Sequence, residues 1–132
     1  MYKPALFAAA VFAMLAVVLG AFGAHALKAV LTPELLLSFE TGVKYQLYHA
    51  LALLALGIMG EQHGINVRRI TQLFVAGIIL FSFSIYALVL MKSTQDIGLG
   101  KLGLLTPIGG VLLIAGWGLL AWQVSPFKTN KH

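Results

Sequence analysis

The sequence predicts an all-α membrane protein, an antiparallel bundle of four transmembrane helices that forms a single domain over residues 1–132. Three observations lead to this prediction. Hydrophobic residues make up 60% of the chain and charged residues only 10%, whereas a typical soluble domain has roughly 25% charged residues. Long apolar segments recur four times along the chain. No segment shows the two-residue alternation that is typical of a strand in a membrane barrel.

Four segments are long enough to cross a bilayer, whose apolar core of ~30 Å needs ~20 helical residues. They are residues 4–27, 41–60, 73–91 and 102–124. The second reaches this length only if Lys44 extends its ammonium group to the interface. The fourth begins either near Leu102 or at Pro107. All connections are short, so consecutive helices are expected to be antiparallel.

Thr32, Pro33 and Glu34 indicate a helix start between the first two spans. They supply a side chain that caps a helix, a proline suited to the first turn, and an acid near the positive end of the helix dipole. We expect a short amphipathic segment here, which either lies on the membrane interface or continues into the second span.

The chain has a formal net charge of +5 and no cysteine. The lack of cysteine excludes disulfides, thiol nucleophiles and thiolate-bound iron–sulfur clusters. The basic residues are scattered over short connections and tails, so we attribute them to anionic lipid and to topology rather than to nucleic acid. Five basic residues lie on the side of the termini: Lys3, Arg68, Arg69, Lys128 and Lys131. Four lie on the other side: Lys28, Lys44, Lys92 and Lys101. This small excess favours cytoplasmic termini.

Polar side chains within the spans are the first place to look for function, because they are costly in hydrocarbon. If depth is counted from the nearest lysine, each helix places one polar side chain ~4–9 Å below the membrane surface that lies opposite the termini. Two more lie one turn away on the same helix faces. If these faces point inward, they form one polar layer that serves either interhelical hydrogen bonding, at ~0.6 kcal/mol per bond, or a ligand, proton or metal site. The six residues are His25, Tyr45, His49, Ser82, Tyr86 and Thr106.

The two histidines of this layer could clamp a haem iron or another metal from adjacent helices. However, no carboxylate lies at the depth of His25 and His49 to add a further ligand. Glu40 is one turn from Lys44, so these two are expected to form an ion pair at the interface. We therefore predict no metal site and no cofactor.

Small residues form stripes on the first and fourth helices. Such stripes let helix backbones approach closely, either within one chain or between subunits. They predict helix packing at Gly20 and Ala24 on the first helix and at Gly109 and Gly116 on the fourth. They are also compatible with a homo-oligomer.

Three stretches of the chain are distinctive: GAFGAHALK from Gly20, FETGVKYQLYHA from Phe39, and TPIGG from Thr106 followed by Gly116-Trp117. Together they resemble the small bacterial inner-membrane proteins grouped as domain-of-unknown-function family 423, which has relatives among eukaryotic transmembrane proteins. Residues 81–86 resemble the third helix of that family, with Ser84 where a glycine is expected. The resemblance implies a four-helix, multi-pass protein of the bacterial cytoplasmic (inner) membrane, and it implies no particular reaction.

No catalytic motif is present, because the chain has no Ser/His/Asp set, no paired carboxylates and no Walker loop. We therefore predict no enzyme activity and no catalytic residues. The favoured hypothesis is a structural or partner-docking bundle, held together by the polar layer. The first alternative is a small oligomeric transporter or channel in which His25 and His49 respond to protons. The second is a binder of a membrane cofactor or lipophilic ligand, such as haem or quinone.

Overall fold

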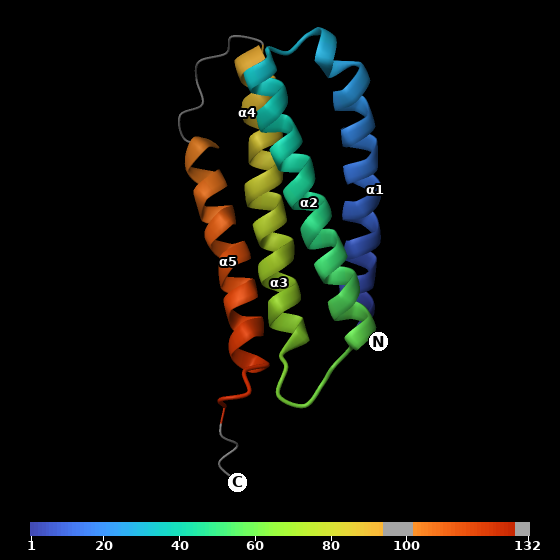
Figure 1. Ribbon diagram of the computed structural model, residues 1–132, viewed down its shortest axis with the longest axis vertical. Coiled ribbons are helices and arrows are strands. Elements are labelled where there is room, and N and C mark those ends of the chain that lie inside the picture. The colour runs from blue at the N-terminus through green and yellow to red at the C-terminus, as the bar shows by residue number, and fades with distance from the viewer. Residues whose placement is uncertain (94–101, 129–132) are drawn as a thin grey trace.

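The computed structural model describes residues 1–93 and 102–128, which form an antiparallel bundle of long helical rods (Figure 1). The first two rods are α1 (Lys3–His25) and α2 (Pro33–Met59). The third is continuous and consists of α3 (Val67–Ile78), η2 (Ile79–Phe83) and α4 (Ser84–Ser93); we call it the α3–α4 rod. The fourth is α5 (Leu105–Gln123). Two short 3₁₀ turns, η1 (Leu27–Ala29) and η3 (Leu102–Leu104), precede α2 and α5.

The start of α2 confirms the helix signal in the sequence. The Thr32 hydroxyl oxygen accepts a hydrogen bond from the backbone N–H of Leu35 at 3.3 Å, and Pro33 is the first helical residue. The expected amphipathic segment is therefore not a separate interfacial helix, because it runs directly into the second predicted span. At its other end α2 stops at Gly60, whose φ of 68° lies in the left-handed region that glycine adopts without strain.

The α3–α4 rod contains the third predicted span and is longer than predicted. Its middle, η2, is a π-helical turn, a feature that is rare in proteins and is often found at functional sites. The rod lies between α2 and α5, whose backbones do not pack against each other among the described residues. Opposite faces of this rod are therefore both buried.

The fourth predicted span begins at Leu105, between the two expected starts. Leu102 belongs to the preceding 3₁₀ turn. Pro107 is the third residue of α5, where its missing N–H costs nothing, because the first N–H groups of a helix have no intrahelical partner.

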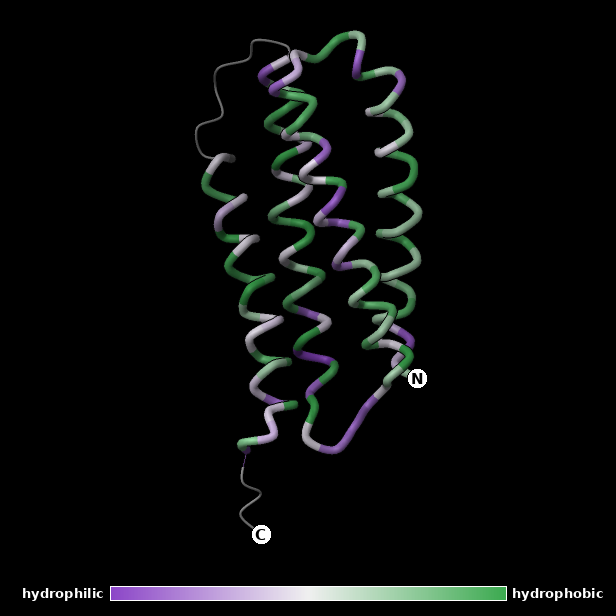
Figure 2. Tube along the Cα trace, viewed as in Figure 1, coloured by the Kyte–Doolittle hydropathy of each residue, from purple (hydrophilic) through white to green (hydrophobic). Residues whose placement is uncertain are grey.

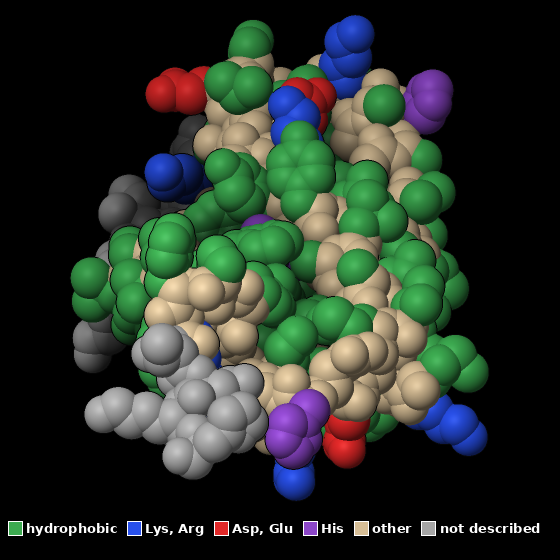
Figure 3. All heavy atoms as spheres, turned by 60° about the horizontal axis from the view of Figure 1, so that its bottom comes forward, with side chains coloured by type: hydrophobic (Ala, Val, Ile, Leu, Met, Phe, Trp, Pro, Cys, Tyr) green, Lys and Arg blue, Asp and Glu red, His purple; other side chains and the backbone are tan. Residues whose placement is uncertain are grey.

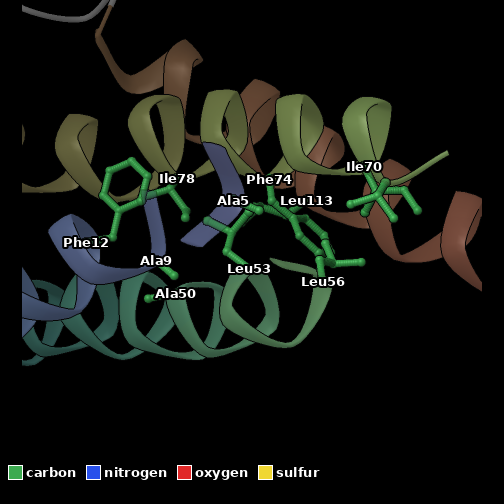
Figure 4. Close-up of a cluster of buried hydrophobic side chains, with 11 residues drawn as sticks. Ala5, Ala9, Phe12, Ala50, Leu53, Leu56, Ile70, Phe74, Ile78 and Leu113 are labelled. Carbon is green, nitrogen blue, oxygen red and sulfur yellow. The ribbon is translucent and has the colours of Figure 1, made fainter. Parts of the chain in front are cut away.

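All four rods contribute to one apolar core (Figure 4). On α1 the core includes the small side chains of Ala5 and Ala9, which let α1 approach its neighbours closely. Gly57 shows the same fit, because a Cβ there would lie 2.5 Å from the Leu6 side chain. The core residues are Ala5, Ala9, Phe12, Ala50, Leu53, Leu56, Val67, Ile70, Phe74, Ile78 and Leu113.

The outer surface exposes many large apolar side chains. Phe7 and Ile114 are 74% and 71% exposed. On the face that Figure 3 shows, hydrophobic side chains occupy much of the side of the bundle, and charged ones lie mainly toward its two ends. Figure 2 shows hydrophilic positions mainly in the connections and along α2. Such an extensive exposed apolar surface is suited to lipid rather than to water.

Within the described residues, three helical segments are long and apolar enough to cross a membrane: Lys3–Ala29, Val67–Ser93 and Leu105–Gln123. The remaining long helix, α2, spans 27 residues, but it is less apolar. Glu34, Glu40 and Lys44 lie in its first half, and Gln46 and His49 lie near its middle.

Candidate functional site: a hydrogen-bonded polar layer

The centre of the polar layer is Gln46, which is fully buried on α2. Its amide nitrogen donates a hydrogen bond to the backbone carbonyl of Phe12 at 2.8 Å. Its amide oxygen accepts a hydrogen bond from the Tyr86 hydroxyl at 2.7 Å. One side chain therefore ties α2 to both α1 and α4.

A second bond joins α2 to the α3–α4 rod one turn away. The Ser82 hydroxyl, which is also fully buried, donates to the backbone carbonyl of Gly42 at 2.7 Å. Ser82 and Tyr86 are four residues apart and share one face of their rod, as Gly42 and Gln46 share one face of α2, so both bonds join the same two helix faces. A Cβ at Gly42 would lie 2.7 Å from the Tyr86 ring, so this close approach needs glycine.

His49 links α2 to α5 through Trp117. The indole N–H of Trp117 donates to Nε2 of His49 at 2.9 Å, and Nδ1 of His49 lies 2.7 Å from the carbonyl oxygen of Tyr45. An indole nitrogen is only a donor, so Nε2 must be the acceptor and the single ring proton must sit on Nδ1. This geometry requires a neutral His49 with both ring nitrogens paired. The aromatic rings of Phe74 and Trp117 contact the imidazole edge to face.

A further pair joins α4 to α5. The Ser84 and Thr106 hydroxyl oxygens lie 2.6 Å apart, and Ser84 also donates to the Phe81 carbonyl at 2.9 Å. Since the one Ser84 proton points to Phe81, Thr106 supplies the proton of the shared bond. Ser84 stands where the family resemblance predicts glycine, and here its hydroxyl has a defined partner.

Close backbone packing accompanies these bonds at the π turn. A Cβ at Gly109 would lie 2.6 Å from the backbone carbon of Leu80, so α5 rests directly on η2. A Cβ at Gly116 would likewise lie 2.6 Å from the Phe74 ring. On α1, a Cβ at Gly20 would make only an ordinary contact of 3.6 Å with the Val43 side chain, and Ala24 is exposed.

His25 does not join the polar layer, although the sequence analysis placed it there. It is the last residue of α1 and is exposed. Gly23 lies against Phe39 and Gly20 against Val43, so His25 is level with a part of α2 about 12 residues, or ~18 Å, before His49. The reason is that α2 extends about three turns beyond Lys44 to Pro33, so Lys44 does not mark the same level as the end of α1.

Three other predicted residues lie at the surface of α2. Glu40 and Lys44 are both exposed, and no ion pair joins them in the part of the chain that the structure describes. Tyr45 is 43% exposed, with its ring packed on Phe81 at 5.1 Å between centroids. Tyr45 therefore contributes its backbone carbonyl to the layer through His49, rather than its hydroxyl.

Sequence reasoning missed three side chains of the layer: Gln46, Ser84 and Trp117. Gln46 carries a detectable signal, since it is an uncharged amide among apolar residues near the middle of a helix. Trp117 carries none, because tryptophan is apolar enough to pass as packing or as part of an aromatic belt.

The layer offers little for catalysis or metal binding. Among the described ranges, no group of three or more His, Cys, Asp or Glu side chains gathers at one place. The Thr71 hydroxyl is the one buried side-chain polar atom in those ranges without a hydrogen-bond partner. The other donors and acceptors described here are paired with one another, and several of these bonds cross between helices.

An apolar bundle whose few buried polar groups bond to each other across helices is the architecture of a helical membrane protein. Comparison with known proteins agrees with this class. Residues 19–110 match the family model described as protein of unknown function (DUF423). The chain belongs to this family.

Relatives from staphylococci cover nearly the whole chain. A UPF0382 membrane protein of Staphylococcus aureus (strain bovine RF122 / ET3-1) is 45% identical over 116 residues, which are 88% of each chain. UPF0382 membrane proteins of Staphylococcus saprophyticus and Staphylococcus haemolyticus are 43% and 40% identical, over 88% and 87% of this chain and 90% and 88% of theirs. No solved structure matches.

Proposed function

We propose that the chain is a non-enzymatic, four-span protein of the bacterial cytoplasmic membrane, a structural or partner-docking bundle locked by its polar layer. The observation that carries this proposal is the pairing within the layer. Gln46, His49, Ser82 and Tyr86 all find their partners inside the chain. Groups that bond to each other rigidify a bundle, and they leave few donors for a substrate.

The case for α2 as a fourth span rests on its length and position. Its 27 residues extend ~40 Å, which exceeds an apolar bilayer core of ~30 Å. It lies alongside three helices that are long and apolar enough to cross. Its buried polar residues face those helices and not the lipid.

Cytoplasmic termini follow from the distribution of basic residues. Among the described residues, the terminal end carries Lys3, Arg68, Arg69 and Lys128. The opposite end carries Lys28 and Lys92, while Lys44 lies about three turns further along α2. The excess on the terminal end favours its placement in the cytoplasm.

The transporter alternative has less support from the geometry. Both ring nitrogens of His49 have hydrogen-bond partners, and His25 is ~18 Å away along the bundle. A proton relay between them would need intermediate groups. A haem ligated by both histidines faces the same separation. A docking role would use the outer faces, whose exposed apolar side chains are suited to contact with another membrane helix.

Single-cysteine labelling tests both the fourth span and the orientation, because the natural chain has no cysteine. We would place cysteine at exposed sites on either side of α2, as Val30→Cys and Gln62→Cys. In intact cells, a membrane-impermeant maleimide should label Val30→Cys and should reach Gln62→Cys only after the membrane is opened. Labelling of both sites from outside would show that α2 does not cross. The reverse pattern would show that the termini are external.

A further inference from the structure

A crevice of about 390 Å³ opens at the end of the bundle opposite the termini. It lies between the beginning of α2, the end of α4 and the beginning of α5. Its walls are apolar and include Leu35, Ile85, Leu88 and Pro107. Its size falls within the ~300–1,000 Å³ range of small-molecule sites.

The hydroxyl groups that line this crevice already donate their protons to other groups of the protein. The Ser38 hydroxyl donates to the Glu34 carbonyl at 3.2 Å, and the Thr41 hydroxyl donates to the Leu37 carbonyl at 3.0 Å. Thr106 donates to Ser84, as described above. These hydroxyl groups have committed their protons within the protein, so they offer only acceptor lone pairs to a ligand.

Lys92 is the one cation among the described residues that line the crevice. It is exposed near the end of α4, and no carboxylate pairs with it among the residues that the structure describes. The crevice therefore combines a positive group at its rim with apolar walls. That combination complements a ligand with an anionic head and an apolar tail.

We propose that the crevice binds an anionic membrane phospholipid, with the phosphate at Lys92 and an acyl chain against Leu35, Ile85 and Leu88. A free anion would leave these apolar walls exposed to water, whereas a lipid covers them. The proposal rests on the membrane placement above, because only there do head groups lie at the level of Lys92. The site is separate from the polar layer, whose members other than Thr106 do not line it.

Native mass spectrometry of the full chain tests this proposal. The protein is released from nanodiscs that contain equal amounts of phosphatidylglycerol and phosphatidylcholine, and the lipids that it retains are counted. The wild type should retain phosphatidylglycerol preferentially. Lys92→Gln should lower that preference about fivefold, as expected for one lysine at a membrane surface. Lys44→Gln is the matched control, since Lys44 is exposed on the same half of the bundle but does not line the crevice. Equal losses in both variants would overturn the proposal.

A second pair of variants tests the cavity itself. Ser38 is exposed, so a larger side chain there should not disturb the core. Ser38→Phe should fill the crevice and remove retained lipid of both kinds, whereas Ser38→Ala should keep it. Unchanged lipid retention in Ser38→Phe would contradict the assignment.

Millimolar inorganic phosphate should leave the lipid bound, and displacement by phosphate would show that the site takes a free anion instead. The cysteine labelling tests the membrane placement independently, so an error there can be told apart from an error in the lipid site.

Discussion

The bond between Gln46 and Tyr86 offers the sharpest test of the polar layer. Gln46→Leu keeps the approximate side-chain volume and removes the acceptor, and Tyr86→Phe removes the donor. The bond is 2.7 Å long, and Gln46 is fully buried. A buried polar group left without a partner costs about 1–3 kcal/mol, while interhelical bonds in membranes average ~0.6 and reach ~1.7 kcal/mol. We expect each single variant to lose about 1–2 kcal/mol of unfolding free energy. The coupling energy should be about 0.6–1.7 kcal/mol.

The assay is reversible unfolding in mixed micelles with increasing sodium dodecyl sulfate, followed by far-UV circular dichroism. The two single variants and the double variant form a double-mutant cycle. Tyr48→Phe is the matched control, because Tyr48 is 56% exposed on the same helix and should not couple to Gln46→Leu. A Gln46–Tyr86 coupling within ~0.3 kcal/mol of zero, or equal to that of the control, would refute the structural role of this bond.

Two further predictions concern α5 and His49. Gly109→Ala should cost about 1–3 kcal/mol, because its Cβ would meet the backbone of Leu80. Gly118→Ala should stay within ~0.5 kcal/mol, since the space there is open; equal stabilities in the micelle assay would contradict the close approach of α5. Nitrogen-15 NMR at neutral pH should find the His49 proton on Nδ1, and Trp117→Phe should shift the Nε2 resonance. A wild-type proton on Nε2 would disprove the bond from Trp117.

Local sequence predicted the start of α2, because a helix start depends on residues within one turn. Thr32 and Pro33 begin α2 as expected. The start of α5 at Leu105 shows the limit of this reasoning. A 3₁₀ turn precedes α5. From the sequence, the helix was expected to begin either near Leu102 or at Pro107.

The polar layer was predictable only in part. Ser82 and Tyr86 lie one turn apart, so their common face followed from helical periodicity, and both do bond to α2. The depth of His25 did not follow, because it depends on how far α1 and α2 are shifted along each other. The π turn at Ile79–Phe83 carries no recognisable signal in the sequence, since its i→i+5 bonds depend on packing with neighbours.

The sequence by itself determined that this chain is helical and belongs in lipid, because apolar composition and segment length depend on no partner. It also supplied the membership of the family, through motifs spread over most of the chain. Only the tertiary structure decided which polar groups meet. The rotation and axial offset of four helices bring Gln46 to Tyr86 and His49 to Trp117, leave His25 at the surface, and place Lys92 on the rim of a crevice. Those offsets arise from side-chain packing between residues far apart in sequence, which no local pattern specifies.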